Sequence, residues 1–491
     1  MGLMRFTVSP PGRITDEAAE QAYLCGMEGI PWLVRTHLEN GELTLERAVS
    51  ESANLHLMWD VPEHGRVALS TAVLMERAKP YHLPLELARG KLGQLRNQIA
   101  EWQMLGLTIP EAVTSKTAEA IHHFSRAAVG QDTQPDSPAL AETSLRVTLD
   151  AVNLLAGCYT DQAISIRRRG GAKLPSVLAG DLGITLLDDF TAQQFLQTFN
   201  AASVPVSWRE VEPTEGAHNW TVCDKQLEWC RVCGLRTYAG PLVQLDRWTL
   251  PDWLYPWQGD FENILSFASD QIRAAVTRYR GKVDFWVCAG RLNTSDSMAL
   301  SEEEHLQLAA RGIELIHSLD PKTPVLLAFD QPWAEYLSRR EMDFPPIHFA
   351  DALVRAGVGL SGIMLEINVG YSPGGTLPRD PVEFSRRLDQ WSVLGLPMHV
   401  AACLPSASNE DPLARRRVRL PPECWTARAQ QTWISRFVPL ILAKPYVHGF
   451  VWNQLRDSEP HEFPHGGLFD LRRHPKPALR AIASIRHAHL K

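Results

Sequence analysis

Hydrophobic residues in the last two-thirds of the chain gather in eight short runs, and each run is followed by a stretch with the apolar spacing of a helix. The runs cover residues 176–179, 204–208, 235–241, 283–289, 324–329, 362–367, 397–402 and 447–452. The helical stretches cover residues 190–200, 223–233, 261–279, 301–319, 345–356, 381–394, 425–442 and 477–489. This alternation predicts a parallel sheet, and eight units favour closure into a (β/α)8 TIM barrel. An open doubly wound sheet is the alternative, but no glycine-rich phosphate loop follows any run.

The first third of the chain has a different pattern, which predicts a separate β-rich and helical region. The turn residues Glu39, Asn40 and Gly41 lie between two alternating segments and predict a hairpin. Long helices are expected at 85–105 and 139–168. We therefore expect a small β-rich module, a helical segment and the barrel, at residues 1–80, 81–170 and 171–491. The small module is interpreted either as a carbohydrate-binding module or as a structural appendage.

Composition narrows the class of protein. The net charge of −7 over 491 residues offers no basic face of the kind that nucleic acids require. No apolar run approaches 18 residues and no secretory leader is recognised, so we expect no membrane segment and a cytoplasmic location. The eight cysteines are scattered, and Cys230 and Cys233 lie inside a helical pattern without a second pair. His461 and His465 share a loop but lack metal-ligand spacing, so neither a metal nor a cofactor is expected.

Several short motifs occur in the order in which one enzyme family has them. They are Trp208 followed by Glu212-Pro213 and Gly216, the Leu-Pro-x-Trp-Leu segment at 250–254, the lead at 395–400 into the seventh run, Trp452, and the closing segments at 467–470 and 475–478. In these features the region from about Leu174 to Arg486 resembles glycoside hydrolase family 10, the xylanase-type enzymes. The resemblance implies a TIM barrel whose active site lies at the carboxyl ends of the strands, and a carbohydrate ligand.

The same comparison shows that both catalytic glutamates of the family are replaced. Arg291 stands at the position of the acid/base glutamate after the fourth run, and Ala402 at the position of the nucleophile in the seventh. Removing both members of such a pair abolishes most of the catalysis. The chain is therefore not expected to be an ordinary xylanase.

Two carboxylates remain at the ends of neighbouring runs, Asp330 and Glu366. Adjacent strands lie about 4.8 Å apart, so the two groups could form a relocated catalytic pair in which one pKa is raised. The alternative is that Glu366 forms a salt bridge with Arg291. Both interpretations stay open at this point.

Aromatic and amide side chains at run ends predict saccharide contacts. Trp208 and Trp452, with Asn453 beside the latter, are the candidates, because sugar C–H faces pack on aromatic rings. Trp286 lies in mid-run and is expected in the core. The basic segment 415–419 is either a solvated loop or a contact for an anion or acidic sugar at the barrel mouth.

Three functions are compatible with these patterns. The first is an O-glycosyl hydrolase with rearranged carboxylates, in which Glu366 and Asp330 are catalytic and Trp208, Arg291, Trp452 and Asn453 bind substrate. The second is a non-catalytic carbohydrate-binding or structural protein on the same barrel. The third is an interaction scaffold without affinity for sugars. The sequence predicts no oligomeric state.

Overall fold

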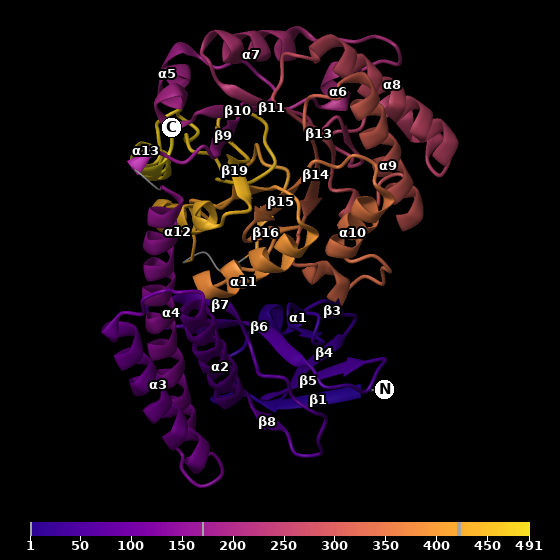
Figure 1. The fold of residues 1–491 in the computed structure, drawn as a ribbon. Helices are drawn as coiled ribbons and strands as arrows, with labels where there is room; N and C mark the ends of the chain where they lie inside the picture. Colours follow the sequence, from indigo (N-terminus) through magenta and orange to yellow (C-terminus); the bar gives the residue numbers. More distant parts are fainter. Residues whose placement is uncertain (1, 169–170, 420–423) are drawn as a thin grey trace. The chain divides into compact units, whose positions relative to one another are not determined.

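The computed structural model describes residues 2–168, 171–419 and 424–491, which divide into two compact units. Unit 1 comprises Met1–Ile166 together with Trp333–Met342 and Leu377–Asp389, and unit 2 comprises the rest of the chain from Arg167 onward. The predicted boundary after residue 170 involves residues 169–170, which lie outside the described residues. Figure 1 draws the amino-terminal part of unit 1 in indigo to purple and unit 2 mainly in magenta to yellow.

Unit 1 combines two four-stranded sheets with long helices. One sheet has the order β4-β5-β1-β8 and the other β3-β2-β6-β7. Their strands are β1 (Gly2–Thr7), β2 (Tyr23–Cys25), β3 (Pro31–Trp32), β4 (Arg35–Glu39), β5 (Glu42–Arg47), β6 (Asn54–Val61), β7 (Gly65–Ser70) and β8 (Tyr81–His82). The hairpin between β4 and β5 is confirmed, and Asn40 and Gly41 both have the positive φ of its tight turn.

Three helices follow the sheets in unit 1: α2 (Leu83–Met104), α3 (Glu111–Gly130) and α4 (Ser137–Arg167). Helices α2 and α4 match the predicted ones, whereas α3 was not predicted. The buried positions of α3 are mostly small or polar, which gives a weak apolar stripe. Val113 and Ala120 are among those that pack into the helical core. A short helix, α1 (Asp16–Glu20), precedes β2.

The two inserted segments join unit 1 through buried ion pairs. Lys91 of α2 pairs with Asp380, and both side chains are almost completely buried. Arg379 donates hydrogen bonds to the Tyr23 hydroxyl at 2.8 Å and to Glu335 at 2.7 Å. A buried charge is tolerated only when it is paired, so these contacts bind residues 333–342 and 377–389 firmly to the amino-terminal sheets.

Unit 2 is a closed parallel barrel, which confirms the predicted fold class. The strands are β9 (Val177–Asp181), β10 (Ala201–Val204), β11 (Arg236–Ala239), β13 (Phe285–Gly290), β14 (Val325–Asp330), β15 (Gly362–Asn368), β17 (Met398–Cys403) and β19 (Val447–Trp452). Each pairs in parallel with the next in the order β11-β10-β9-β19-β17-β15-β14-β13, and β13 pairs back to β11. The short strand β12 (Val243–Gln244) adds to the end of β13.

The predicted second strand is displaced toward the amino terminus. We expected it at 204–208, but β10 ends at Val204, and Trp208 begins the short helix α6 (Trp208–Val211). Pro205 follows β10 directly and has no N–H to donate to a neighbouring strand, so the ladder stops there. Trp208 therefore lies in the loop after β10.

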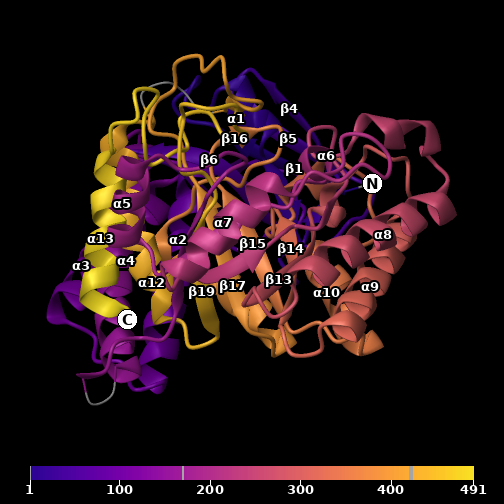
Figure 2. The same cartoon turned by 90° about the horizontal axis from the view of Figure 1, so that it is seen from above.

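Helices surround the barrel between its strands. They are α5 (Asp189–Thr198), α7 (Thr221–Val232), α8 (Phe261–Tyr279), α9 (Glu302–Leu319), α10 (Pro346–Ala356), α12 (Ala427–Ala443) and α13 (Pro477–His489). Figure 2 shows α8, α9 and α10 outside strands β13 and β14. The predicted cap of α9 is confirmed as a reciprocal capping box between Ser301 and Glu304. Helix α11 (Pro381–Trp391) groups with unit 1 up to Asp389.

The barrel interior is packed with side chains and leaves no pore. Its layers include Val177, Ala179, Tyr238, Phe285, Leu326, Ala328, Met364 and Val451. The Tyr238 hydroxyl lies 2.8 Å from the His399 ring, so these two polar groups within the core are satisfied. Because the core is filled, chemistry is confined to the carboxyl ends of the strands and their loops.

Candidate functional site

A cavity of about 240 Å³ opens at the carboxyl ends of the barrel strands. Residues at or near six strand ends line it: Asp181, Ser203, Gly240, Arg291, Glu366 and Asn453. Trp208 and Trp248 come from the loops after β10 and β12, and Arg415, Arg456, Glu459, His461, Glu462 and Phe463 from the loops after β17 and β19. The cavity thus occupies the position in which barrel enzymes hold their substrates.

Arg291 is placed directly after β13 by a left-handed backbone conformation, with φ of 60°. From there its Nε and one terminal nitrogen donate hydrogen bonds to the Glu366 carboxylate at 2.9 and 2.7 Å. The other terminal nitrogen donates to Glu462 at 2.5 Å. The salt bridge that the sequence offered as one alternative for Glu366 is therefore present, and it extends to a second carboxylate.

The chain of charges continues from Glu462 to Arg416, whose Nε donates to the same carboxylate at 2.7 Å. Four charges thus alternate across the site and cancel in pairs. Burial alone would raise the pKa of Glu462, but the guanidiniums of Arg291 and Arg416 outweigh it and hold that pKa at about 2. Burial raises the pKa of Glu366, and Arg291 opposes that shift.

Asp330 is the partner of Glu366 in the register of β14 and β15, yet the two carboxylates have different surroundings. Asp330 is buried and does not line the cavity. One of its oxygens accepts a long hydrogen bond of 3.4 Å from the side chain of Gln331. Asn293 holds the Asp330 backbone by two hydrogen bonds. Asp330 contributes to the site through its charge, which raises the pKa of Glu366.

Asp181 is a cavity-lining carboxylate that the sequence interpretation missed. It ends β9 and accepts hydrogen bonds from the Gly183 backbone N–H at 2.8 Å and from the Ser203 hydroxyl at 3.0 Å. Burial raises its pKa to about 6, with a further increase from the Glu366 charge, although the two hydrogen bonds lower it. The sequence could have identified Asp181, because an acidic residue at the carboxyl end of the first barrel strand lies at the end of the barrel that holds the active site.

The predicted tryptophans differ in their access to the cavity. Trp208 lines it but is almost fully buried, and its indole N–H donates to Glu212 at 2.8 Å. Trp452 is fully buried, is not among the lining residues, and donates to the Gly466 carbonyl at 3.0 Å. Trp248, which the sequence did not single out, lines the cavity and is 38% exposed. Trp286 is buried in the barrel, as expected.

Asn453 is connected to Glu366 through hydrogen bonds of Asn368. Its side-chain N–H donates to Asn368 at 2.9 Å, and Asn368 in turn lies 3.4 Å from the Glu366 carboxylate. Both amides are thereby oriented, which leaves the Asn453 side chain as a fixed polar group on the cavity wall.

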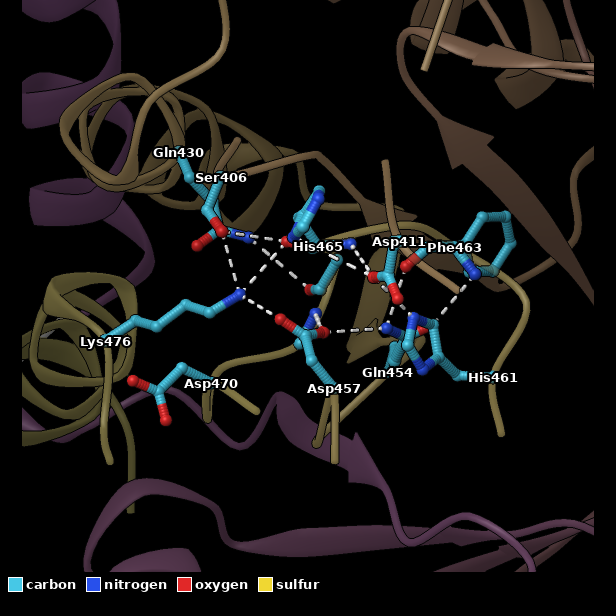
Figure 3. A network of polar contacts seen from close by, with 12 residues as sticks. Ser406, Asp411, Gln430, Gln454, Asp457, His461, Phe463, His465, Asp470 and Lys476 are labelled. Atoms are coloured by element: carbon cyan, nitrogen blue, oxygen red, sulfur yellow. Dashed lines mark hydrogen bonds and ion pairs between the residues drawn. The ribbon is translucent and has the colours of Figure 1, made fainter. Parts of the chain in front are cut away.

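A network of buried polar groups holds the loops that carry Glu462 and Phe463 (Figure 3). Asp411 accepts hydrogen bonds from His461 at 3.0 Å and from the His465 backbone at 3.1 Å. Gln454 exchanges two hydrogen bonds with the Phe463 backbone, at 2.8 and 2.9 Å.

The other half of this network is centred on Asp457. Lys476 donates to its carboxylate at 2.5 Å, and the Gly467 backbone donates to it at 2.6 Å. Lys476 also donates to the Ser406 hydroxyl at 2.8 Å, so the network spans the loops after β17 and β19 (Figure 3). Such a satisfied network gives the cavity a rigid wall.

Within the described residues, no group of three histidines, cysteines or acidic residues is arranged to hold a metal ion. Across the same parts of the chain, none of the helices has the length and apolar character needed to cross a membrane.

Comparison with known proteins finds similarity at the level of structure only. No family model matches the chain, and no curated protein matches it. Among solved structures, xylanase 10B from Thermotoga petrophila RKU-1 in complex with xylobiose is 17% identical, with a TM-score of 0.49, and the match covers 64% of this chain and 94% of that one. Native xylanase 10B from Thermotoga maritima is 17% identical, with a TM-score of 0.48 and coverage of 64% and 95%.

A third match is the family 10 glycoside hydrolase from Paenibacillus barcinonensis, at 16% identity and a TM-score of 0.47, with coverage of 64% and 95%. These proteins come from the family that the sequence motifs resemble. The barrel assignment itself rests on the closed ring of parallel strand pairs described above.

Proposed function

We propose that this protein binds a saccharide in the cavity of unit 2 and does not cleave it by the mechanism of family 10 enzymes. One observation carries the proposal: the Arg291 guanidinium lies between Glu366 and Glu462 and hydrogen-bonds to both. A cation therefore occupies the centre of the site, at the chain position that the resemblance gives to the acid/base glutamate.

Glycoside cleavage requires one carboxyl group that holds a proton and a second that is ionised and free to act. Glu462 is held ionised by two guanidiniums, and Glu366 has its oxygen Oε2 occupied by two hydrogen bonds from Arg291. Such groups serve well as fixed hydrogen-bond acceptors for sugar hydroxyls. They serve poorly as proton donors or nucleophiles, because both roles require Arg291 to give up its partners.

The cavity wall supports binding in two further ways. Trp248 adds a partly exposed aromatic side chain to the wall, beside which the C–H groups of a sugar can pack. Asn453 and Ser203 add polar groups at fixed positions. A mixture of one aromatic surface and several oriented polar groups is typical of small-molecule sites.

The raised pKa of Asp181 favours a second candidate function, a hydrolase with rearranged carboxylates. With a pKa of about 6, Asp181 retains a proton in part near neutral pH and would protonate the leaving oxygen, while Glu366 would be the ionised partner. This candidate requires a glycan that reaches Asp181 and a partner carboxylate at the same time.

A glycan array followed by calorimetry on each hit tests the first proposal, and an assay for release of reducing ends on the same hits tests the second. Binding without release supports a binding protein. Release that disappears in Asp181→Asn and Glu366→Gln, with binding retained, supports the hydrolase. If no glycan binds, both proposals fail and an interaction scaffold is left.

We further propose that the protein works in a reducing compartment such as the cytoplasm. All eight cysteines are free thiols, and five of them are buried. Thiols that remain unpaired in a chain of this size are typical of intracellular proteins. Mass determination of the purified protein after alkylation without reductant should find eight modified thiols once the protein is unfolded.

A further inference from the structure

At one edge of the cavity, the guanidinium groups of two arginines lie over the ring of one tryptophan. Arg247 lies with its guanidinium carbon 4.3 Å from the centre of the Trp248 ring, and that of Arg415 lies 5.1 Å from it. Trp248 and Arg415 line the cavity, and Arg247 is exposed beside them. We call Arg247, Trp248 and Arg415 the cationic edge. Its members come from two separate loops, one after β12 and one after β17.

The two guanidiniums of the cationic edge differ from the other arginines of the site. Arg291 and Arg456 line the cavity and are each paired with a glutamate, and Arg416 is paired with Glu462. In the described parts of the chain, by contrast, no carboxylate oxygen lies within 4.0 Å of the guanidinium of Arg247 or Arg415. The positive charge of the edge is therefore not neutralised by an ion pair.

Asp246 is the acidic residue adjacent to the edge in sequence, and its oxygens are engaged elsewhere. One accepts hydrogen bonds from the backbone N–H groups of Trp248 and Thr249, at 2.8 and 3.0 Å. The other accepts from the side chain of Gln244. Asp246 thus shapes the turn that presents Trp248, and its oxygens are not paired with either guanidinium.

We infer that the cationic edge binds an anionic substituent of the glycan, either the carboxylate of a uronic acid or a sulfate ester. This inference rests on the proposed saccharide binding in the cavity. A guanidinium stacked on an aromatic ring keeps its N–H edge free, and that edge matches the oxygens of a carboxylate or sulfate in a two-point contact. Two such groups beside one cavity favour negative charge on the ligand, because the neighbouring guanidiniums of Arg291, Arg416 and Arg456 are already paired with glutamates.

The experiment is calorimetry with matched pairs of oligosaccharides at low and high salt. Each uronate-bearing oligosaccharide is compared with its carboxyl-reduced form, and each sulfated one with its desulfated form. We expect at least one acidic form to bind about tenfold or more tightly than its neutral counterpart, with the preference falling as salt rises. The two arms of the panel separate carboxylate from sulfate recognition.

Variants connect the preference to the edge. Arg415→Gln and Arg247→Gln should each reduce the ratio of the affinities for the acidic and the neutral form, and the double variant should abolish the preference. Arg417→Gln is the matched control, since Arg417 is exposed in the short strand β18 (Arg417–Val418), two residues after Arg415, and does not line the cavity. Thermal unfolding of each variant checks that the fold is kept.

The outcomes separate this inference from the proposed function. If neutral and acidic forms bind equally, or if the double variant keeps the preference, the inference is overturned while saccharide binding stands. If no oligosaccharide of either kind binds, saccharide binding fails and the inference fails with it. A preference that is lost in Arg417→Gln as strongly as in Arg415→Gln also overturns the assignment to the edge.

Discussion

Arg291 and Glu366 are joined by two hydrogen bonds of 2.9 and 2.7 Å, although strand β14 lies between the strands that carry them. The guanidinium reaches over the end of β14 because Arg291 leaves β13 in a left-handed conformation. Glu366 is 7% exposed, and a carboxylate so buried requires a cation or a proton. The pair therefore favours the ionised form of Glu366 and contributes to the stability of the barrel at this end.

Replacing Arg291 alone should be strongly destabilising. Arg291→Met leaves Glu366 buried without its partner, and breaking a buried pair in this way costs about 3–5 kcal/mol. The double variant Arg291→Met/Glu366→Gln should recover a large part of that loss. Urea unfolding followed by intrinsic tryptophan fluorescence measures the shift of the transition midpoint.

Arg311→Met provides the control for that measurement, since Arg311 forms an exposed pair with Glu314 on α9. It should change the free energy of unfolding by less than about 0.5 kcal/mol. A loss of equal size in Arg291→Met and Arg311→Met would show that the buried pair has no special role.

Xylan should not be hydrolysed by the purified protein at a measurable rate. Arg291 and Ala402 stand where the resemblance places the acid/base and the nucleophile, and Arg291 hydrogen-bonds to both Glu366 and Glu462. Reducing-sugar release from xylan is the measurement, with a family 10 xylanase as positive control. Turnover of even about 1 per second, below the median of about 10 for enzymes, would contradict this prediction.

Trp248 and Trp452 should respond differently to substitution. Trp248→Ala removes a partly exposed ring from the cavity and should weaken saccharide binding by about 1 kcal/mol or more. Trp452→Phe removes the indole N–H that is bonded to Gly466, so it should lower stability by about 1–2 kcal/mol and leave affinity unchanged. Calorimetry and thermal unfolding on both variants check this, and the opposite assignment of effects would refute it.

Much of the barrel was predictable because each strand is a short apolar run between helical stretches. Seven of the eight runs overlap their strands for most of their length. For example, the run 283–289 overlaps β13, and the run 447–452 coincides with β19. The exception is the second, where apolar residues continue through Pro205 although the ladder ends before it. Helix α3 was missed because its buried positions, which include Thr117, Ala120, Ala127 and Gly130, are mostly small or polar.

The site was predictable in part. A lone carboxylate in a barrel strand needs a partner, so the Arg291–Glu366 pair could be anticipated from chemistry alone. Glu462 and Arg416 could not, because they are brought to Arg291 by long loops whose paths depend on distant contacts such as that between Asp411 and His461. Trp452 ends its strand as expected, but the direction of a side chain at a strand end is set by neighbours that the pattern does not reveal.

Asp181 should make the barrel less stable as the pH rises through about 6. Its folded-state pKa is about 6, mainly because of burial, whereas an unfolded aspartate has a pKa of about 3.9. The folded state therefore binds the proton more tightly than the unfolded state. The stabilisation is fully present below about pH 4 and is lost as the pH rises through about 6. Each pKa unit corresponds to about 1.4 kcal/mol, and discounting for residual solvent contact leaves about 1–2 kcal/mol.

The Asp181→Asn variant should remove this dependence, because an amide keeps an acceptor for the Gly183 N–H and does not titrate. Thermal midpoints of wild type and variant are compared between about pH 4 and pH 8. The midpoint of the wild type should fall relative to that of the variant as the pH rises. Asp188→Asn is the control. The Thr191 backbone N–H lowers the pKa of Asp188, so the stabilisation by this carboxylate is fully present above the unfolded value of about 3.9, and the difference between wild type and Asp188→Asn should stay constant over this pH range. Parallel pH profiles for wild type and Asp181→Asn would show that Asp181 titrates normally, and would remove the support for Asp181 as a proton donor.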